Sequence, residues 1–426
     1  RYMLTLSARR DGYSAFGQAN PRATFPSVAL GWVFTDEKFF KSSWLNYGKL
    51  RASWGVNGNR DIGRYVALSN LITGKYLYVK GDGTVYQANQ LYVDRMQNSN
   101  LKWEKTTSYN LGLDFGILNN RIDGSIEVYK SSTTDLLVQR SLPDVVGFSF
   151  VMDNLGEVQN RGFEISLNSV NMNRSKFTWR TSFNFQLNRN KIVHLYGDKD
   201  ATGKERDDVA NRWFIGHSID EIWNFKVDGV WQVSEKDEAT KYGVKPGDFK
   251  IVDVDGDGKY TNADKMFQGW TNPRFRWTMR NEFKLFNTLD VAIAMYSYWG
   301  HSASFNQAKN RDGFLDRTSS YIFPYWTEAN PTNDWARLYS SEGGASGFSV
   351  YRKRSFIRLD NISVGYSLPK SLVQKAAIQN VKLFGSIRNL GYYAPTWNFW
   401  DAEPDSDTNT DRPAPRIISI GLDITL

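Results

Sequence analysis

The stretch Asp253–Asp264 places acidic side chains at a spacing that suits a hard metal ion. Asp253, Asp255 and Asp257 occupy alternate positions, and Gly258 follows where the chain must turn sharply. These residues match the first, third, fifth and sixth positions of an EF-hand-like loop, whose oxygen ligands converge on one cation. The spacing therefore predicts a Ca²⁺ site.

Two further residues would complete the predicted site. Lys259 would contribute its backbone carbonyl, and Asp264 its carboxylate at the last position, where glutamate is usual. The alternative is an acidic, glycine-rich turn without a metal, held by hydrogen bonds from its own backbone. We expect the metal, because three carboxylates this close would otherwise repel one another. The ion would stiffen a loop, with no catalytic role.

Aromatic residues are concentrated in segments that are predicted to be loops. Flat rings stack on sugars and also bury peptide side chains, so they are candidates for contact with a ligand or a partner. The candidates for such contacts are Tyr325, Trp326, Trp335, Trp397 and Trp400. The alternative is that these rings pack the loops against one another or form an interfacial girdle. Arg352–Arg354 would either bind lipopolysaccharide phosphates or extend to the outer interface.

Signals for enzyme chemistry are poor, and we expect no catalytic residues. His194, His217 and His301 lie far apart, and the chain has no nucleophile elbow, phosphate loop or dinucleotide fingerprint. The net charge is +8, but basic and acidic residues are interspersed without a basic block. We therefore expect neither an enzyme nor a nucleic-acid-binding protein.

The elements that must position these residues show strand periodicity. Apolar and polar residues alternate in Tyr109–Ile117, Phe177–Asn188 and Ile418–Leu426, so each strand has one apolar and one polar face. Similar strands are predicted at Tyr2–Arg9, Leu50–Asn57, Ile122–Tyr129, Gly162–Asn168, Phe275–Leu285, Leu289–Trp299, Ile362–Leu368 and Val381–Asn389.

The length and the polar faces of these strands fit a membrane protein better than a soluble one. The chain is 41% hydrophobic with a mean hydropathy of −0.51, and no run is long enough for a membrane helix. The predicted strands have about the length that a tilted strand needs to cross a bilayer. Their polar faces carry charged residues and favour a wet interior, although a soluble β-protein would show the same alternation.

Connection lengths separate these alternatives. Very short turns, such as Asn119–Asn120 and Asn287–Thr288, alternate with long polar connections. The long connections are Asp61–Asn100, Ala201–Asn211, Ser234–Asn272, His301–Val350 and Tyr392–Arg416. This alternation is typical of outer-membrane barrels, with short turns in the periplasm and long loops outside. About fourteen strands are expected, the region Lys191–Trp231 being left uncounted.

Six stretches of the sequence, taken in order, form a recognisable series. They are Asn154–Glu164, Pro246–Phe249 with Asp253–Lys259, Gly269 with Pro273–Phe275, Trp326–Pro331, Phe356–Pro369 and Arg388–Leu390. Together they resemble SusC-type TonB-dependent transporters (the SusC/RagA family), a group typical of Bacteroidetes. Any one is weak evidence, but six in order are specific.

The resemblance implies that residues 1–426 are one domain, the C-terminal part of a transmembrane antiparallel β-barrel of about 22 strands in the Gram-negative outer membrane. A plug domain would precede these residues. The implied function is energised import of oligosaccharides or oligopeptides. The implied partners are a SusD-like surface lipoprotein, outer-membrane lipid and the TonB–ExbB–ExbD complex, reached through the N-terminal part.

Other functions remain open at this point. A passive porin or a structural surface barrel would lack the plug and TonB coupling. The third hypothesis is an outer-membrane or secreted enzyme that acts on glycans or lipid. The residues do not separate a glycan from a peptide ligand. One departure from the barrel pattern is Leu426, where an aromatic residue usually aids assembly.

Overall fold

The computed structural model describes an all-β protein over residues 1–14, 16, 19–61, 67–142, 144–148, 150–309, 324–373, 378–397, 401–403 and 414–425. In this described part, no helix has the length and apolar character needed to span a membrane. The helical elements are short: η1 (Phe34–Asp36), η2 (Asp144–Val146), η3 (Val233–Glu235), α1 (Lys236–Lys241), η4 (Asn262–Asp264), η5 (Asn306–Lys309) and α2 (Lys370–Val373).

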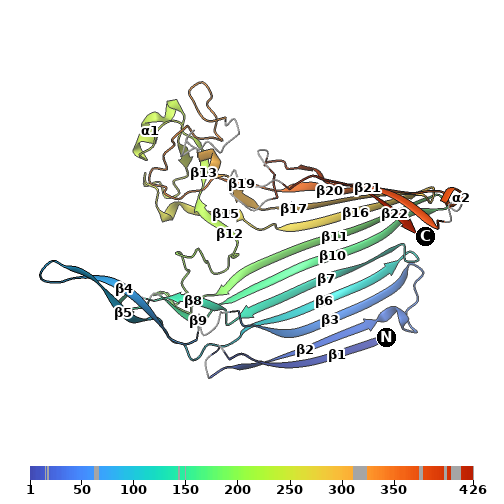
Figure 1. Ribbon diagram of the computed structural model, residues 1–426, viewed down its shortest axis with the longest axis horizontal. Coiled ribbons are helices and arrows are strands. Elements are labelled where there is room, and N and C mark those ends of the chain that lie inside the picture. The colour runs from blue at the N-terminus through green and yellow to red at the C-terminus, as the bar shows by residue number, and fades with distance from the viewer. Residues whose placement is uncertain are drawn as a thin grey trace. The chain divides into compact units, whose positions relative to one another are not determined.

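Twelve strands form one sheet in the order β1-β2-β3-β6-β7-β10-β11-β16-β17-β20-β21-β22 (Figure 1). Their bounds are β1 Tyr2–Gly12, β2 Arg22–Val33, β3 Leu45–Asn59, β6 Glu104–Ile117, β7 Ile122–Thr134, β10 Glu157–Arg174, β11 Phe177–His194, β16 Phe275–Leu285, β17 Leu289–Trp299, β20 Phe356–Ser367, β21 Asn380–Tyr393 and β22 Ile417–Thr425. Every predicted strand corresponds to one of these.

Ten shorter strands pair locally within the long connections. The pairs are β4 (Asn70–Val79) with β5 (Val85–Arg95), β8 (Leu137–Ser141) with β9 (Phe150–Asn154), β12 (Glu221–Phe225) with β15 (Lys265–Trp270), β13 (Val227–Val230) with β14 (Phe249–Ile251), and β18 (Ser302–Ser304) with β19 (Tyr351–Lys353). Among the described residues, the large sheet holds twelve strands, fewer than the fourteen or so expected. In Lys191–Trp231, β11 ends at His194 and no further strand joins the sheet among the residues described there.

Contacts divide the chain into two compact units, each described here by itself. Unit 1 comprises Arg1–Glu164 and Asn188–Ile219, and unit 2 comprises Ile165–Leu187 and Asp220–Leu426. The strands β10 and β11 contribute residues to both units.

Short turns in each unit use left-handed backbone at asparagine. In unit 1, Asn119 and Asn120 between β6 and β7 both have φ of 58°. In unit 2, Phe286 and Asn287 between β16 and β17 have φ of 52° and 60°. Asparagine tolerates this region better than most residues, and such turns match the twist of an antiparallel hairpin.

In unit 2, the end of the last strand lies at the edge of the sheet that carries the turn between β16 and β17. The amide of Ser367, at the end of β20, donates to the Thr288 carbonyl, and the amide of Gln379 donates to the Thr425 carbonyl. Within unit 2, the turn between β16 and β17 and the last residues of β22 therefore share one edge, and the long connections leave from the other (Figure 1).

The strand β2 is absent from the sequence predictions because Pro26 interrupts its pattern. Proline cannot donate a ladder hydrogen bond, so it normally argues against an interior strand. Pro26 pairs with Ala8 of β1, whereas the pairing of β2 with β3 begins only at Ser27, opposite Gly55. Pro26 therefore lies just before the part of β2 that is paired with a strand on both sides.

Each unit exposes one apolar strand face. In unit 2, Ile418, Ile420 and Leu422 of β22 are 67%, 87% and 54% exposed. In unit 1, Leu4 and Leu6 of β1 are similarly exposed. A row of bare aliphatic side chains is costly in water and favourable in lipid, so these faces are those of membrane strands.

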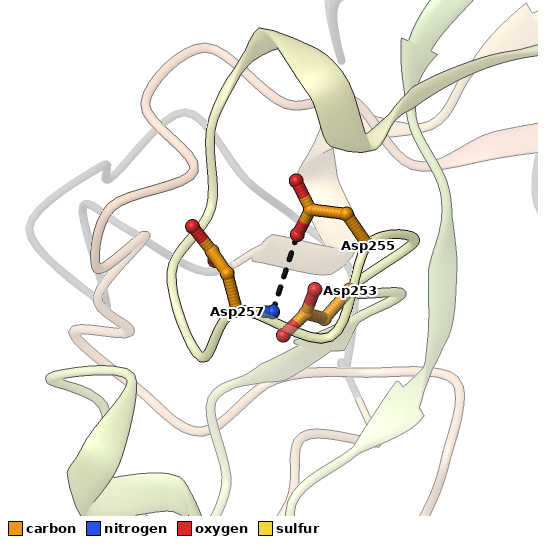
Figure 2. A group of neighbouring side chains, drawn as sticks. All are labelled: Asp253, Asp255 and Asp257. Atoms are coloured by element: carbon orange, nitrogen blue, oxygen red, sulfur yellow. Dashed lines mark hydrogen bonds between the residues drawn. The ribbon is translucent and has the colours of Figure 1, made fainter.

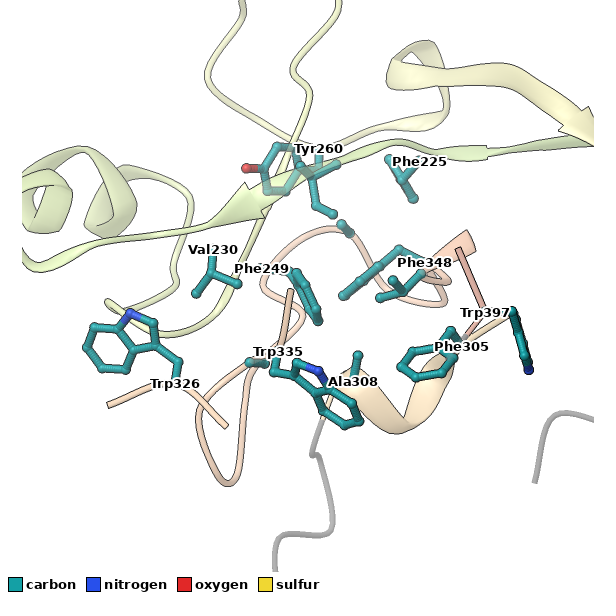
Figure 3. Close-up of a cluster of buried hydrophobic side chains, with 14 of the residues drawn as sticks. Phe225, Val230, Phe249, Tyr260, Phe305, Ala308, Trp326, Trp335, Phe348 and Trp397 are labelled. Carbon is teal, nitrogen blue, oxygen red and sulfur yellow. The ribbon is translucent and has the colours of Figure 1, made fainter. Parts of the chain in front are cut away.

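The long connections of unit 2 pack together with a core of their own, which we call the loop body (residues 220–274, 300–309, 324–355, 394–397 and 401–403). Its buried side chains come from connections far apart in the sequence (Figure 3). They include Phe225, Phe249, Phe305, Trp326, Trp335, Phe348 and Trp397. Connections predicted to be long polar loops are therefore held as one packed body.

Candidate functional site

The acidic loop of the loop body gathers three carboxylates between β14 and η4. One oxygen each of Asp253, Asp255 and Asp257 lies within 4.8 Å of the others. Asp253 is partly buried and the other two are exposed. Figure 2 shows the three side chains on one tight turn. This arrangement could hold a hard cation such as Ca²⁺, which prefers carboxylate oxygens.

Hydrogen bonds within the turn also account for much of its shape. Asp253 accepts hydrogen bonds from the amides of Gly256 and Gly258, at 2.7 and 2.9 Å, and from the Tyr242 hydroxyl at 3.0 Å. Burial alone raises the pKa of Asp253, but these donors outweigh it and hold the pKa below the usual value. The carboxylate is therefore charged at neutral pH.

The other two residues predicted for the metal site lie differently. Asp264 is fully buried, and its two oxygens accept hydrogen bonds from the amides of Val254 and Thr261, at 2.8 and 2.7 Å. Asp264 thus closes the loop and does not belong to the group of three carboxylates. Lys259 donates its amide to Asp257, at 2.8 Å.

Three of the tryptophans predicted to contact a ligand are buried in the loop body. Trp326, Trp335 and Trp397 are only 7%, 4% and 2% exposed (Figure 3). They pack the connections together, which was the alternative interpretation. Tyr325 is 38% exposed and remains available for contact, and Trp400 lies outside the described residues.

The basic stretch 352–354 also belongs to the loop body. Arg352 places its guanidinium 4.0 Å from the centre of the Phe305 ring, and Arg354 is 4% exposed. Stacking of a guanidinium on an aromatic face offsets part of the cost of its burial. Two of the residues considered for phosphate contact are therefore packing residues of the loop core.

A buried ion pair that sequence reasoning missed lies at the centre of the loop body. Asp248 is fully buried, and its Oδ1 lies 2.8 Å from Nε of Arg337. Its carboxylate also accepts hydrogen bonds from the amides of Ser341 and Lys245, both at 2.9 Å. One carboxylate thereby fastens two connections that are distant in the sequence. The signal was present, since Asp248 belongs to the Pro-Gly-Asp motif.

The polar strand face of unit 1 carries a charge network across three strands. Arg51 of β3 binds Asp114 of β6 through two hydrogen bonds of 2.8 Å and Glu127 of β7 through a third of 2.8 Å. Arg51 lies opposite Gly112, which in turn lies opposite Glu127. A side chain at position 112 would lie 3.0 Å from the guanidinium of Arg51. Because Gly112 has no side chain, Arg51 can extend across β6 to Glu127.

Unit 2 contains a similar ion pair that bridges strands across a glycine. Lys382 of β21 reaches Asp290 of β17 at 2.8 Å, with Gly365 of β20 lying between them. A side chain at Gly365 would come within 2.6 Å of the lysine chain. In both units, a glycine on the middle strand lets a cation bridge the strands on either side. These faces are charged, hydrogen-bonded surfaces suited to a water-filled interior.

His301 lies where the loop body meets β17, and its burial predicts that the stability of the loop body depends on pH. It is 8% exposed, and burial, followed by the charges of Arg354 and Arg276, lowers its pKa from 6.5 to about 4. As the pH falls from about 6.5 to 4, the unfolded chain binds a proton that the folded chain does not accept, which costs about 3 kcal/mol.

We therefore expect the loop body to lose stability over that pH range, and His301→Gln to lose less of it. Hydrogen exchange of the loop-body amides at pH 7 and pH 4.5 measures the difference. His194→Gln, at an exposed histidine of unit 1, is the matched control. An equal loss in the wild-type protein and His301→Gln would contradict the prediction.

Comparison with known proteins gives the family context. The family model for "TonB dependent receptor-like, beta-barrel" matches residues 1–276. TonB-dependent receptor P3 of Formosa agariphila is 32% identical over 99% of this chain and 42% of its own length. TonB-dependent receptor SusC of Bacteroides thetaiotaomicron is 28% identical over the whole chain and 42% of its own length.

A solved structure agrees in fold. The RagAB peptide importer in its open-open state superposes with a TM-score of 0.78 at 22% identity, covering all of this chain and 45% of that chain. The chain therefore spans less than half the length of the curated relatives it matches and of this structure.

Proposed function

Because the chain belongs to the TonB-dependent receptor β-barrel family, we propose that it forms the barrel wall of a transporter that imports a nutrient with energy from the TonB complex. The family is one of outer-membrane receptors and not an enzyme class, and this protein lies in the outer membrane. The main support for the proposal is that the strands have two different faces. One face is apolar and exposed, and the other is charged, with ion pairs that bridge neighbouring strands across a glycine.

The proposed ligand is an oligosaccharide or an oligopeptide, delivered by a SusD-like surface lipoprotein. Relatives named SusC and RagAB support this pairing, and the RagAB structures are described as those of a peptide importer. The loop body offers one packed surface for such a lipoprotein, with Tyr325 exposed on it. The TonB–ExbB–ExbD complex would act on a plug domain that precedes this chain.

Co-purification tests this assignment. The full-length protein is extracted from outer membranes in mild detergent, and associated proteins and ligands are identified by mass spectrometry. A surface lipoprotein, plug peptides from the same polypeptide and a bound oligosaccharide or peptide are the expected result. A barrel recovered without plug peptides or a lipoprotein would contradict the proposal and favour a passive barrel.

We also propose that the acidic loop binds Ca²⁺ through Asp253, Asp255 and Asp257. Three carboxylates within 4.8 Å of one another support the proposal. Removing Ca²⁺ with a chelator should increase protease cleavage of the loop, and Asp255→Asn should weaken Ca²⁺ binding about tenfold or more, since a ligand charge is lost.

The control for this variant is Asp228→Asn, which changes an exposed acidic residue elsewhere in the loop body. Calorimetric titration of full-length protein with CaCl₂ measures the affinity. If Asp255→Asn and Asp228→Asn bind Ca²⁺ like the wild-type protein, or if no binding is detected in any of them, the loop is an acidic turn without a metal.

A further inference from the structure

The apolar strand face of unit 1 contains a hollow of about 580 Å³ that spans β2, β3, β6 and β7. Ala52 of β3 lines it between Leu30 of β2, which lies opposite on one side, and Leu111 of β6, which lies opposite on the other. Val128 of β7 continues the same row. The row thus has one small side chain among large ones, and this leaves a depression in the surface.

The lining of the hollow is that of a surface in contact with lipid. Leu30, Leu111 and Val128 are 54%, 53% and 45% exposed. Arg51, with its ion pairs, directly precedes Ala52 in β3, so the charge network lies on the opposite strand face. The outward face of a barrel strand meets the acyl chains of the bilayer. Because acyl chains are as apolar as these side chains, a preference for one lipid depends on packing and on its headgroup.

The next row toward the long connections carries two aromatic residues. Trp54 of β3 lies opposite Val28 of β2 and Tyr109 of β6, and all three line the hollow. Tyr109 is 56% exposed. Tryptophan and tyrosine are concentrated where the membrane meets water. This row therefore marks the outer rim of the apolar face.

A lysine lies at this rim. Lys130 of β7 is opposite Tyr109 in the strand register and lines the hollow. Its side chain is exposed, and it forms no ion pair with an acidic residue in the described part of the chain. The hollow therefore has a free positive charge at its outer end.

Arg161 of β10, the neighbour of β7 in the sheet, adds a second positive charge (Figure 1). A side chain at Gly162 would lie 2.2 Å from the Tyr129 ring, so these two residues are neighbours on one strand face. Tyr129 shares that face with Glu127, two residues earlier. Lys130 and Arg161 are therefore neighbours on the other face, the apolar one. Arg161 is exposed and, like Lys130, has no ion pair with a described acidic residue.

Two free cations beside an apolar hollow suit an anionic lipid. A charge on the lipid-facing side of a barrel strand is costly toward the middle of the bilayer and is tolerated near its surface. Long cationic side chains at that depth either extend to water or pair with lipid phosphates. The hollow favours the second alternative, because a lipid whose phosphate lies at the rim has an acyl chain directly below it.

We propose that the hollow and its two cations bind one phosphorylated glycolipid of the outer leaflet, of the lipid A class. Lys130 and Arg161 hold a phosphate group, Trp54 and Tyr109 contact the sugar, and an acyl chain packs over Ala52. The outer leaflet follows from the place of the cations, at the strand ends from which the long connections leave. The site lies on the outward face, so it does not depend on the proposed import function.

Native mass spectrometry of the delipidated full-length protein, titrated with lipid in detergent, tests this site. The probes are lipid A, lipid A without its phosphate groups, and phosphatidylethanolamine. The wild-type protein should bind lipid A about tenfold or more tightly than the phosphate-free form, the size expected for a charged hydrogen bond. Lys130→Gln combined with Arg161→Gln should bind the two forms alike.

The matched control is Lys75→Gln combined with Lys80→Gln, which removes two exposed lysines in and directly after β4, outside the hollow. This variant should keep the preference for the phosphorylated form. Ala52→Trp fills the hollow and should weaken the binding of both forms of lipid A while leaving the ratio between them unchanged. Circular dichroism checks that each variant retains its strand content.

Four results would overturn the proposal. The wild-type protein might bind the phosphate-free form equally well, or the variant without Lys130 and Arg161 might keep the preference. Ala52→Trp could bind lipid A as tightly as the wild-type protein does. Finally, phosphatidylethanolamine could bind as tightly as lipid A, which would show an unselective contact with membrane lipid.

Discussion

Replacing Asp248 with alanine (Asp248→Ala) is expected to lower the stability of the loop body by about 3–5 kcal/mol. The carboxylate is fully buried and pairs with Arg337 at 2.8 Å. Its loss would leave the guanidinium without its partner and two amides, those of Lys245 and Ser341, without their acceptor. Hydrogen exchange of the loop-body amides in the full-length protein measures the change.

Asp334→Ala is the control for this prediction. Asp334 also faces an arginine, Arg352, but at 3.9 Å and with a side chain that is 79% exposed. Exposed pairs contribute about 0–1 kcal/mol, so this variant should exchange almost like the wild-type protein. Equal exchange rates for Asp248→Ala and Asp334→Ala would show that the buried pair does not hold the loop body together.

Replacing Gly247 with alanine should cost the loop body about 2–4 kcal/mol, from left-handed backbone and overpacking together. Gly247 has φ of 89°, and a methyl group there would come within 2.5 Å of the Trp326 ring and 2.8 Å of Cβ of Arg337. The amide of Arg337 also donates to the Gly247 carbonyl at 2.7 Å, so the two segments cannot separate without losing this bond. Hydrogen exchange again measures the loss.

Gly256→Ala separates the two causes. Gly256 has a similar φ of 73°, but no atom lies within 4 Å of an added methyl group. This variant should therefore cost only the backbone contribution, about 1–2 kcal/mol. If Gly247→Ala cost no more than Gly256→Ala, close packing beneath Trp326 would not be the reason for the glycine in the Pro-Gly-Asp motif.

The strands could be predicted from the sequence because their signal is local. The alternation in Phe275–Leu285 and Leu289–Trp299 coincides with the bounds of β16 and β17. The asparagine turn between them was also recognisable, because only a few residue types adopt left-handed backbone readily. The strand β2 was missed because proline is a local signal against a strand. A strand can contain Pro26 only where no neighbouring strand needs a hydrogen bond from that position, which the sequence does not show.

The roles of the loop residues depend on long-range packing and could not be predicted. An aromatic residue in a polar connection looks the same whether it contacts a ligand or a core. Trp335 and Trp397 are buried because connections far apart in the sequence meet around Phe305. The same limit applies to Asp264, whose spacing suited a metal ligand but whose oxygens bind the backbone of the loop.

The charge bridges of the polar strand faces were also beyond sequence reasoning. Arg51 and Glu127 are far apart in the chain, and their pairing depends on the register that sets Gly112 between them. A register shift of one residue would move each of these side chains to the apolar face. The charges were visible in the sequence, but the register that pairs them was not.

Energised uptake is the measurement that tests the central claim most directly. Cells that carry the full-length protein are given the labelled ligand identified by co-purification, with and without an uncoupler that dissipates the proton-motive force. The proposed import function predicts accumulation that the uncoupler abolishes and that is lost when the TonB complex is absent. Uptake that is unchanged by both treatments would contradict it, and the protein would then be a passive barrel.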